Sequence, residues 1–229
     1  MKKLIYDSKD AKKIFFTSDT HFGHINIIKY CNRPFESIDE HDEEIIKRWN
    51  DKVKEDDIVF HLGDVGFCHP KKIHEYLERL NGHIYLVIGN HDWRSIVKQQ
   101  SWRFEDMTQQ INMKIDGQHI ILNHYPLLCY SGVYHSKPSW QLYGHVHSGP
   151  YSTNGLDNSR LEMCYSTQYD VGVDNNDFTP VSFLELKDII DRRIKEYKLN
   201  KSYEQFRLGK ITIGELNKCK LETVFNYGK

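Results

Sequence analysis

Three short apolar runs in the first half of the sequence, separated by helix-like segments, constrain the fold more than any other feature. The runs cover residues 14–17, 57–62 and 84–88, and each one is followed by polar residues. Two amphipathic segments lie between them, one over residues 37–53 and one that begins at Pro70. Strands that alternate with helices are typical of a largely parallel sheet covered by helices.

The second half of the sequence has a different pattern, which predicts a second sheet. Residues 113–115 and 119–122 lie on either side of Asp116-Gly117, a dipeptide that favours a tight hairpin turn. Three further short runs have the same β-prone character: 140–143, 169–173 and 180–183. We expect these segments to form a mixed or antiparallel sheet that stacks on the first.

The C-terminal segment is predicted to be helical. One helix is expected over residues 185–199, and a second begins at Thr212, where Thr212 and Glu215 form a capping-box pattern. Residues 200–229 carry six basic and three acidic side chains, a net charge of +3. We expect one domain over residues 1–186 and a helical extension over residues 187–229.

Composition argues against tight binding to duplex nucleic acid, against a membrane span and against a disulfide-rich protein. The 31 basic and 32 acidic residues give a formal net charge of −1, so the chain lacks the positive field that drives tight binding to duplex nucleic acid. No stretch approaches the roughly 20 apolar residues that a membrane span requires. The five cysteines are widely spaced and form no C-x-x-C pair. We therefore expect a cytoplasmic protein with reduced thiols.

Polar clusters rich in histidine and aspartate follow the predicted strands. Their members are Asp19, His21, Asp64, Asn90, His91, Asp92, His124, His145 and His147. Because the carboxyl ends of strands converge on one crevice in open α/β sheets, we expect these side chains to meet. Carboxylate, imidazole and amide ligands together suit Mn, Fe, Zn or Ni better than Ca. Seven of these side chains are candidate ligands, which is too many for one tetrahedral ion but enough for two ions that share a carboxylate.

The order of these motifs resembles that of a known family. D-x-H, G-D, G-N-H-D, a histidine before Tyr-Pro, and G-H-x-H are similar to the motifs of the calcineurin-like metallophosphoesterase superfamily. The segments S-D-T-H-F-G-H and N-R-P-F most resemble its small bacterial and phage-type members. The resemblance covers residues 14–147 and is expected to extend to about residue 185. It implies an α/β fold, a four-layer α/β/β/α sandwich of two mixed sheets.

The resemblance also implies a role for each motif residue. One divalent ion would be held by the side chains of Asp19, His21, Asp64 and His147. A second ion would share Asp64 and be completed by Asn90, His124 and His145. His91 would face the substrate phosphate as a general acid, and Asp92 would orient His91.

Three residues outside the ligand set have two interpretations. We predict that His24 and Arg33 touch substrate at the rim of the cleft, with helix capping and packing as the alternative. Asp174 follows a short β-prone run and is interpreted as a turn residue rather than a cleft residue.

The resulting functional hypothesis is a dinuclear metal-dependent phosphoesterase. It would hydrolyse phosphodiesters or phosphomonoesters, including those of nucleotides, with Mn²⁺ as the expected metal and Fe, Zn, Ni or Mg as alternatives. Protein phosphatases of the superfamily continue G-D with Asp-Arg-Gly and follow G-N-H with Glu. Here Val65 follows Asp64 and Asp92 replaces that Glu, which disfavours protein dephosphorylation.

Two alternative functions stay open at this point. A nuclease acting on RNA or single-stranded ends is supported only by the basic C-terminal segment. A binding module without catalysis would be expected to have lost some of the motif residues, and all of them are present.

Overall fold

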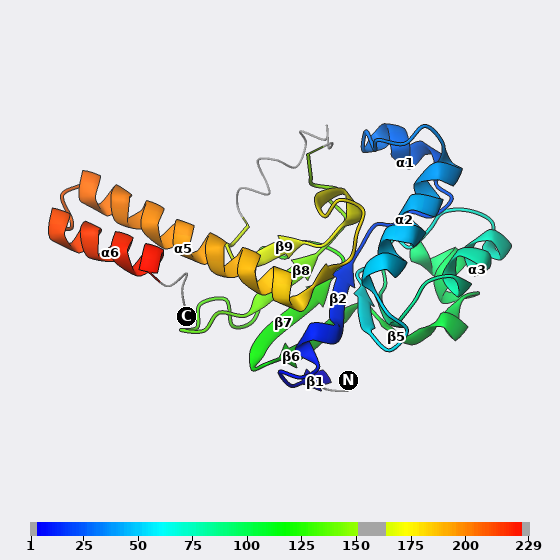
Figure 1. Cartoon of the computed structure of the whole chain (residues 1–229), viewed down its shortest axis with the longest axis horizontal. Helices are drawn as coiled ribbons and strands as arrows, with labels where there is room; N and C mark the ends of the chain where they lie inside the picture. The colour runs from blue at the N-terminus through cyan, green and yellow to red at the C-terminus, as the bar shows by residue number, and fades with distance from the viewer. Residues whose placement is uncertain (1–3, 151–163, 226–229) are drawn as a thin grey trace. The chain divides into compact units, whose positions relative to one another are not determined.

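The computed structural model describes residues 4–150 and 164–225, and Figure 1 shows its helices and strands. Contacts between residues divide the chain into two compact units, Met1–Glu185 and Leu186–Lys229. Among the described helices, none is both long enough and apolar enough to span a membrane.

The predicted parallel sheet is present, with its strands in the order β10-β2-β3-β4-β5. The strands are β2 (Ile14–Thr17), β3 (Ile58–His61), β4 (His83–Val87), β5 (Phe104–Thr108) and β10 (Val181–Ser182). Strands β2 to β5 are parallel to one another, and β10 pairs antiparallel with β2. The expectation that the run 180–183 joins the second sheet is wrong, because Val181 and Ser182 pair with β2 at the edge of the first. The largely parallel sheet expected from the three apolar runs is confirmed.

Two helices from the connections, α2 (Ile38–Lys52) and α3 (Pro70–Glu78), pack on this first sheet (Figure 1). A shorter helix, α1 (Ile25–Tyr30), lies in the connection between β2 and α2. The hydroxyl of Ser37 caps α2 by accepting a hydrogen bond from the backbone N–H of Glu40 at 3.1 Å. Trp49 of α2 and Ile73 of α3 are buried in one core with Val59 of β3. The two amphipathic segments are therefore confirmed as helices.

Short helical turns occupy other connections. They are η1 (Ala11–Lys13), η2 (Trp93–Val97), η3 (Ser101–Arg103) and η4 (Val173–Asn175). Of these, η2 follows the polar cluster after β4, and η4 lies two residues beyond the end of the second sheet's last strand.

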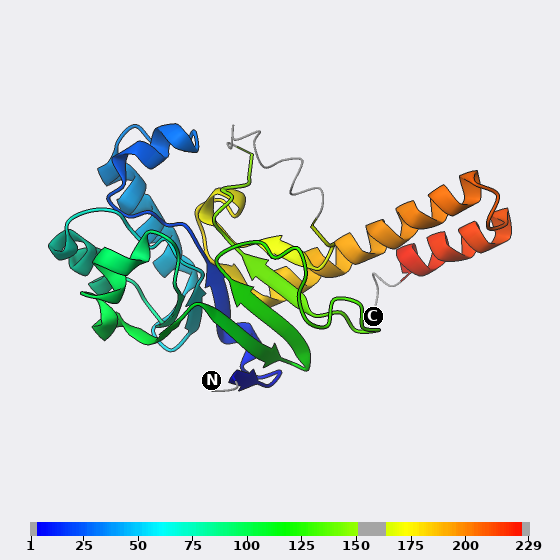
Figure 2. The same ribbon diagram turned by 180° about the vertical axis from the view of Figure 1, so that it is seen from behind.

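The second sheet has the strand order β1-β6-β7-β8-β9, and Figure 2 shows it from behind. The strands are β1 (Leu4–Tyr6), β6 (Gln110–Ile115), β7 (Gln118–Asn123), β8 (Trp140–Tyr143) and β9 (Gln168–Asp170). Strands β6 and β7 form the predicted hairpin, with positive φ angles of 48° at Asp116 and 72° at Gly117. The other three pairings are parallel, so the sheet is mixed.

Aromatic side chains join the two sheets. Phe60 of β3 stacks on Phe16 and Tyr85 within its own sheet, and its ring lies 6.3 Å from the ring of Tyr6 in β1. The preceding residue, Val59, points to the opposite face and joins the core under α2 and α3. The α/β class with two mixed sheets is thus confirmed.

The last two described elements are helices, α5 (Phe183–Arg207) and α6 (Ile213–Phe225). The first is longer than the predicted 185–199 and ends near Gly209, whose φ of +68° suits a helix terminus. The capping box is confirmed: Glu215 accepts a hydrogen bond from the backbone N–H of Thr212 at 2.7 Å, and Thr212 accepts one from that of Glu215 at 3.2 Å.

Candidate metal centre

The predicted ligands meet where the strands of both sheets end. Four of them, Asp19, His21, Asp64 and Asn90, follow β2, β3 and β4 of the first sheet, whereas His124, His145 and His147 follow β7 and β8 of the second. Two groups of ligand atoms each lie within 4.8 Å of one another: Asp19, His21 and His147, and Asp64, His124 and His145. The structure therefore brings six of the seven predicted ligands into two adjacent clusters, and the seventh, Asn90, contacts the second of them.

Asp64 occupies the central position between the two clusters. Its Oδ2 atom lies 3.7 Å from Nε2 of His21 in one cluster and 3.6 Å from Nε2 of His124 in the other. Burial, with the nearby Asp19 carboxylate, raises the pKa of Asp64. Because the two buried carboxylates of Asp19 and Asp64 repel each other, they favour a cation between them.

Two atoms of the first cluster are buried without a hydrogen-bond partner among the described residues: Oδ1 of Asp19 and Nε2 of His21. These atoms lie 3.9 Å apart. Burial and neighbouring imidazoles, chiefly that of His147, hold the pKa of His21 well below its usual range. A neutral imidazole and a carboxylate oxygen that both lack partners are the donor set that a transition ion would satisfy.

The tautomer of His124 points to the same use in the second cluster. Its Nδ1–H donates to the carbonyl oxygen of Leu62 at 2.7 Å, and with Nδ1 protonated the tautomer that binds a metal has its lone pair on Nε2. That Nε2 lies 3.0 Å from Oδ1 of Asn90, which is itself an acceptor. Converging acceptors repel one another unless a cation lies among them, so the second cluster also fits a metal ion.

The backbone at this site is unusual. Five of the predicted ligands have left-handed φ angles: Asp19 (58°), His21 (51°), Asp64 (56°), His145 (71°) and His147 (48°). Such a conformation costs about 1–3 kcal/mol per residue and tends to cluster at functional sites. A Cβ on Gly89 would collide with the Asp64 carboxylate, and one on Gly144 would collide with Asp19, so these loops need glycine for close approach.

His91 lies beside the clusters with its ring partly open to solvent. Its Nε2 is 3.9 Å from Oδ2 of Asp64, and its backbone N–H donates to Oδ1 of the same residue at 2.9 Å. The side chain is 40% exposed, in contrast to the buried His21 and His124. This placement suits a group that meets substrate from the solvent side.

Asp92 has a different contact from the one expected. We predicted that it orients the ring of His91, but its carboxylate accepts hydrogen bonds from three backbone N–H groups, those of Asp64, Val65 and Gly89, at 2.8–3.0 Å. Its side chain is thus used to fix the two loops that present Asp64 and Asn90, because buried backbone donors need acceptors.

His24 and Arg33 are placed differently from each other. Nδ1 of His24 lies 3.2 Å from Nδ1 of His21, at the edge of the site. Arg33 is only 3% exposed, and its guanidinium donates to the backbone carbonyls of Asp19 and Thr20. A substrate contact does not fit this burial, and packing, the alternative interpretation, does.

Asp174 is the residue of this site that the sequence interpretation missed. Its two oxygens accept from Nε and Nη2 of Arg33, both at 2.8 Å, and Oδ2 also accepts from Nδ1–H of His147 at 2.8 Å. Burial raises the pKa of Asp174, but Arg33 outweighs it and lowers that pKa to about 2. Cys31 lies near Asp174 and His147, so these three residues could also hold a metal ion. The guanidinium of Arg33, however, already neutralises the negative charge of the Asp174 carboxylate. The available signal was its place beyond a short strand, like the other clusters.

Comparisons with known proteins cover the same segment. A sequence model of the calcineurin-like phosphoesterase superfamily domain matches residues 13–156. An uncharacterized protein of Methanocaldococcus jannaschii is 35% identical over 190 residues, which cover 82% of this chain and 94% of that protein. The gene 66 protein of Mycobacterium phage L5 is 28% identical over 58% of this chain and 77% of its own. The crystal structure of a protein of unknown function from Aquifex aeolicus is 26% identical with a TM-score of 0.59, covering 77% of this chain and 98% of that one.

Proposed function

Because the chain belongs to the calcineurin-like phosphoesterase superfamily, we propose that it hydrolyses phosphate esters with two divalent ions bound at this centre. The observation that supports this most directly is the pair of ligand clusters on either side of Asp64. Asp19, His21, Asp64 and His147 would hold one ion, and Asp64, Asn90, His124 and His145 the other. All of these residues lie within the unit Met1–Glu185, and we propose that residues 187–229 are an extension of that domain.

In the proposed reaction, His91 would supply a proton, and Arg33 and Asp174 would hold the metal ligands in position. When bound, the two ions neutralise phosphate oxygens and lower the pKa of the attacking water. His91 would hold a proton at Nε2 for the leaving oxygen, since it is a partly exposed imidazole near Asp64 that belongs to neither ligand cluster. Arg33 and Asp174 fix the backbone of Asp19 and the ring of His147, so the ligands are in place before substrate arrives.

Turnover of bis-p-nitrophenyl phosphate and p-nitrophenyl phosphate with Mn, Ni, Co, Zn or Mg tests this function. We expect hydrolysis with at least one ion, and with Mn²⁺ in particular, since the donors are carboxylate, imidazole and amide. Absence of turnover with every ion would favour a binding module of the same fold. Release of mononucleotides from an oligonucleotide would instead identify a nuclease.

Metal binding is expected to stabilise the folded chain. At 100 times its Kd, one ion contributes about 2.7 kcal/mol, which for a domain of this size raises Tm by roughly 5–10 °C. Differential scanning calorimetry with and without Mn²⁺ measures the shift, and excess EDTA should reverse it. An unchanged Tm at saturating metal would contradict the proposed centre.

Replacement of Asp174 by asparagine is expected to weaken metal binding by about 10–100-fold at one of the two sites. The Asp174 carboxylate orients His147 and makes its Nε2 more basic, and loss of such an outer partner has this effect in other metal sites. Isothermal titration calorimetry measures the two affinities separately.

The matched control for this variant is Asp177→Asn. It removes the same charge from an exposed side chain that pairs with Arg48, outside the ligand clusters. Circular dichroism would show that both variants are folded. Equal metal affinities in the two variants would rule out a positioning role for Asp174.

A further inference from the structure

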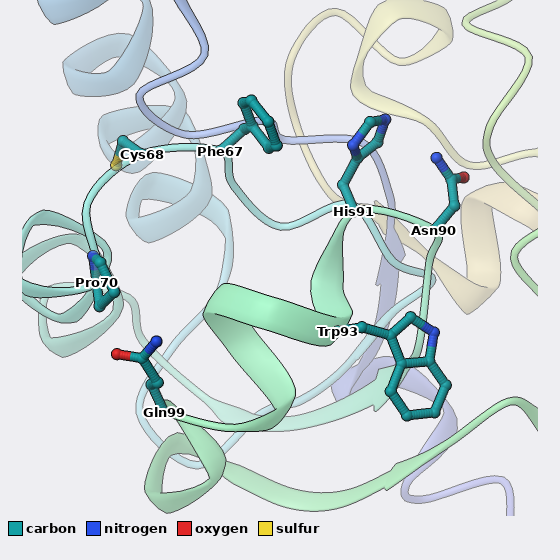
Figure 3. A pocket seen from close by; sticks show the side chains of 7 residues that line it. All are labelled: Phe67, Cys68, Pro70, Asn90, His91, Trp93 and Gln99. Carbon is teal, nitrogen blue, oxygen red and sulfur yellow. The ribbon is translucent and has the colours of Figure 1, made fainter.

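A cavity of about 570 Å³ adjoins the proposed metal centre on the side of Asn90 and His91 (Figure 3). Phe67 and Trp93 line it, and they are 54% and 48% exposed although both are large and apolar. Figure 3 shows that these two rings come from different segments, the loop after β3 and the first turn of η2. Cavities of this size accommodate small organic ligands, so the space is larger than a phosphate group needs.

The ring of Phe67 is held against the proposed general acid. It meets the ring of His91 edge-on, with centroids 5.5 Å apart at 77°, and lies 5.1 Å from the ring of His24. Phe67 therefore contacts two imidazoles on the edge nearest the reacting centre, while more than half of its surface stays open. An open aromatic surface beside a catalytic group favours stacking by a flat ligand group.

The position of His91 indicates which part of the substrate would enter. This step rests on the proposed function, in which His91 gives its proton to the leaving oxygen. The group bonded to that oxygen must then lie on the His91 side of the phosphate, and the cavity opens on that side. The cavity would accordingly receive the leaving group and not the other ester substituent.

The chemistry of the walls narrows the identity of this group. None of the described lining residues carries a carboxylate, an ammonium or a guanidinium, so the walls do not suit a second phosphate or a charged side chain. Phe67, Pro70 and Trp93 make part of the lining apolar, and the amide of Asn90 and the imidazole of His91 add hydrogen-bonding groups on the side of the metal centre. A flat, uncharged ring with polar edges fits such walls, and nucleobases have this character.

We propose that the cavity binds a nucleobase, so that the substrate is an ester whose leaving group is a nucleoside. Base stacking on aromatic side chains contributes about 1–3 kcal/mol per base without requiring a particular base. The cavity would thus select nucleoside esters as a class.

The test compares adenosine 5′-phosphate with ribose 5-phosphate, which have the same leaving oxygen; ribose 5-phosphate carries an anomeric hydroxyl where the adenosine compound carries the base. The methyl esters of both provide the diester pair, and the dinucleotide ApA tests a base at the end of a strand. Esters of p-nitrophenol are unsuitable because their ring is itself flat and could stack. With Mn²⁺, we expect kcat/KM to be at least about tenfold higher for the adenosine ester.

Variants of the two aromatic residues test whether the preference for the adenosine ester arises in this cavity. Trp93→Ala and Phe67→Ala should each reduce the ratio of the two kcat/KM values about tenfold, and Trp93→Phe and Phe67→Tyr should restore most of it. Tyr197→Ala removes an exposed aromatic ring of α5, distant in sequence from the cavity, and should leave the ratio as it is in the parent protein. A base preference that survives both alanine variants would overturn the assignment to this cavity.

A binding measurement keeps this inference separate from the proposed function. Calorimetry with the non-hydrolysable 5′-methylenephosphonates of adenosine and ribose needs no turnover, and we expect the adenosine compound to bind at least about tenfold more tightly. If esters are hydrolysed but the base affects neither kcat/KM nor Kd, the nucleobase site is wrong and the phosphoesterase stands. If no ester is hydrolysed, the proposed function fails, and equal Kd values would refute the base site independently.

Discussion

Replacement of Asp64 by asparagine is expected to abolish phosphate ester hydrolysis, with kcat/KM lowered by roughly 10³-fold or more. Loss of an outer partner already costs about 10–100-fold, and Asp64 is the ligand proposed to be shared by both ions. Its Oδ2 atom lies within 3.9 Å of the Nε2 atoms of His21, His91 and His124. Asparagine keeps the shape of the side chain but removes its charge and one oxygen ligand.

The measurement pairs kcat/KM with the metal content of the purified variant. We expect the Asp64→Asn protein to retain fewer than two ions, and its Tm to respond less to Mn²⁺ than that of the parent. Asp116→Asn is a matched control, because Asp116 also has a left-handed φ, at 48°, but lies in the β6–β7 turn. A folded Asp64→Asn protein that still binds two ions would contradict the bridging role.

Replacement of His91 by alanine is expected to leave metal binding intact and to lower kcat about 10²–10⁴-fold. His91 is partly exposed and lies outside both ligand clusters, and we assign it to the leaving oxygen and not to an ion. A general acid matters most when the leaving group is a poor one. The loss should therefore be large for alkyl esters and much smaller for p-nitrophenyl esters.

Comparison of the two kinds of ester in the His91→Ala protein separates this role from a structural one. His83→Ala is the control, since it removes an exposed histidine that pairs with Glu105 on β5. Loss of bound metal in His91→Ala would make His91 a ligand. Full activity on an alkyl ester would show that it is not the acid.

The sequence predicted the central strands and two of the four edge strands, β9 and β10, and it missed the other two, β1 and β5. Strands β2, β3 and β4 carry continuous apolar side chains because helices cover one face and a second sheet covers the other. Strands β1 and β5 lie at the edges, and their patterns are weak: Ile5 of β1 is 62% exposed, and β5 includes Glu105 and Asp106. An edge strand is held mainly by hydrogen bonds to one neighbour, which side-chain periodicity does not record.

In the candidate site too, residues in local motifs were predicted, whereas contacts between residues distant in the sequence were not. Motif spacing was sufficient to nominate Asp19, Asp64 and His124, because each follows a strand. The contacts of Asp174 with Arg33, 141 positions away, depend on how the chain closes and leave no trace in local sequence. The left-handed backbone at Asp19 and His147 is likewise imposed by tertiary contacts, since neither residue type requires it.

The two sheets contribute to the metal centre in nearly equal parts, and this division has a kinetic consequence. Asp64 follows β3 of the first sheet and His124 follows β7 of the second, so an ion held by both would connect layers that separate when the protein unfolds. Contacts that form after the transition state for folding slow unfolding and leave the folding rate nearly unchanged. If the two sheets pack together only after this transition state, bound ions would slow unfolding and so lengthen the lifetime of the native state.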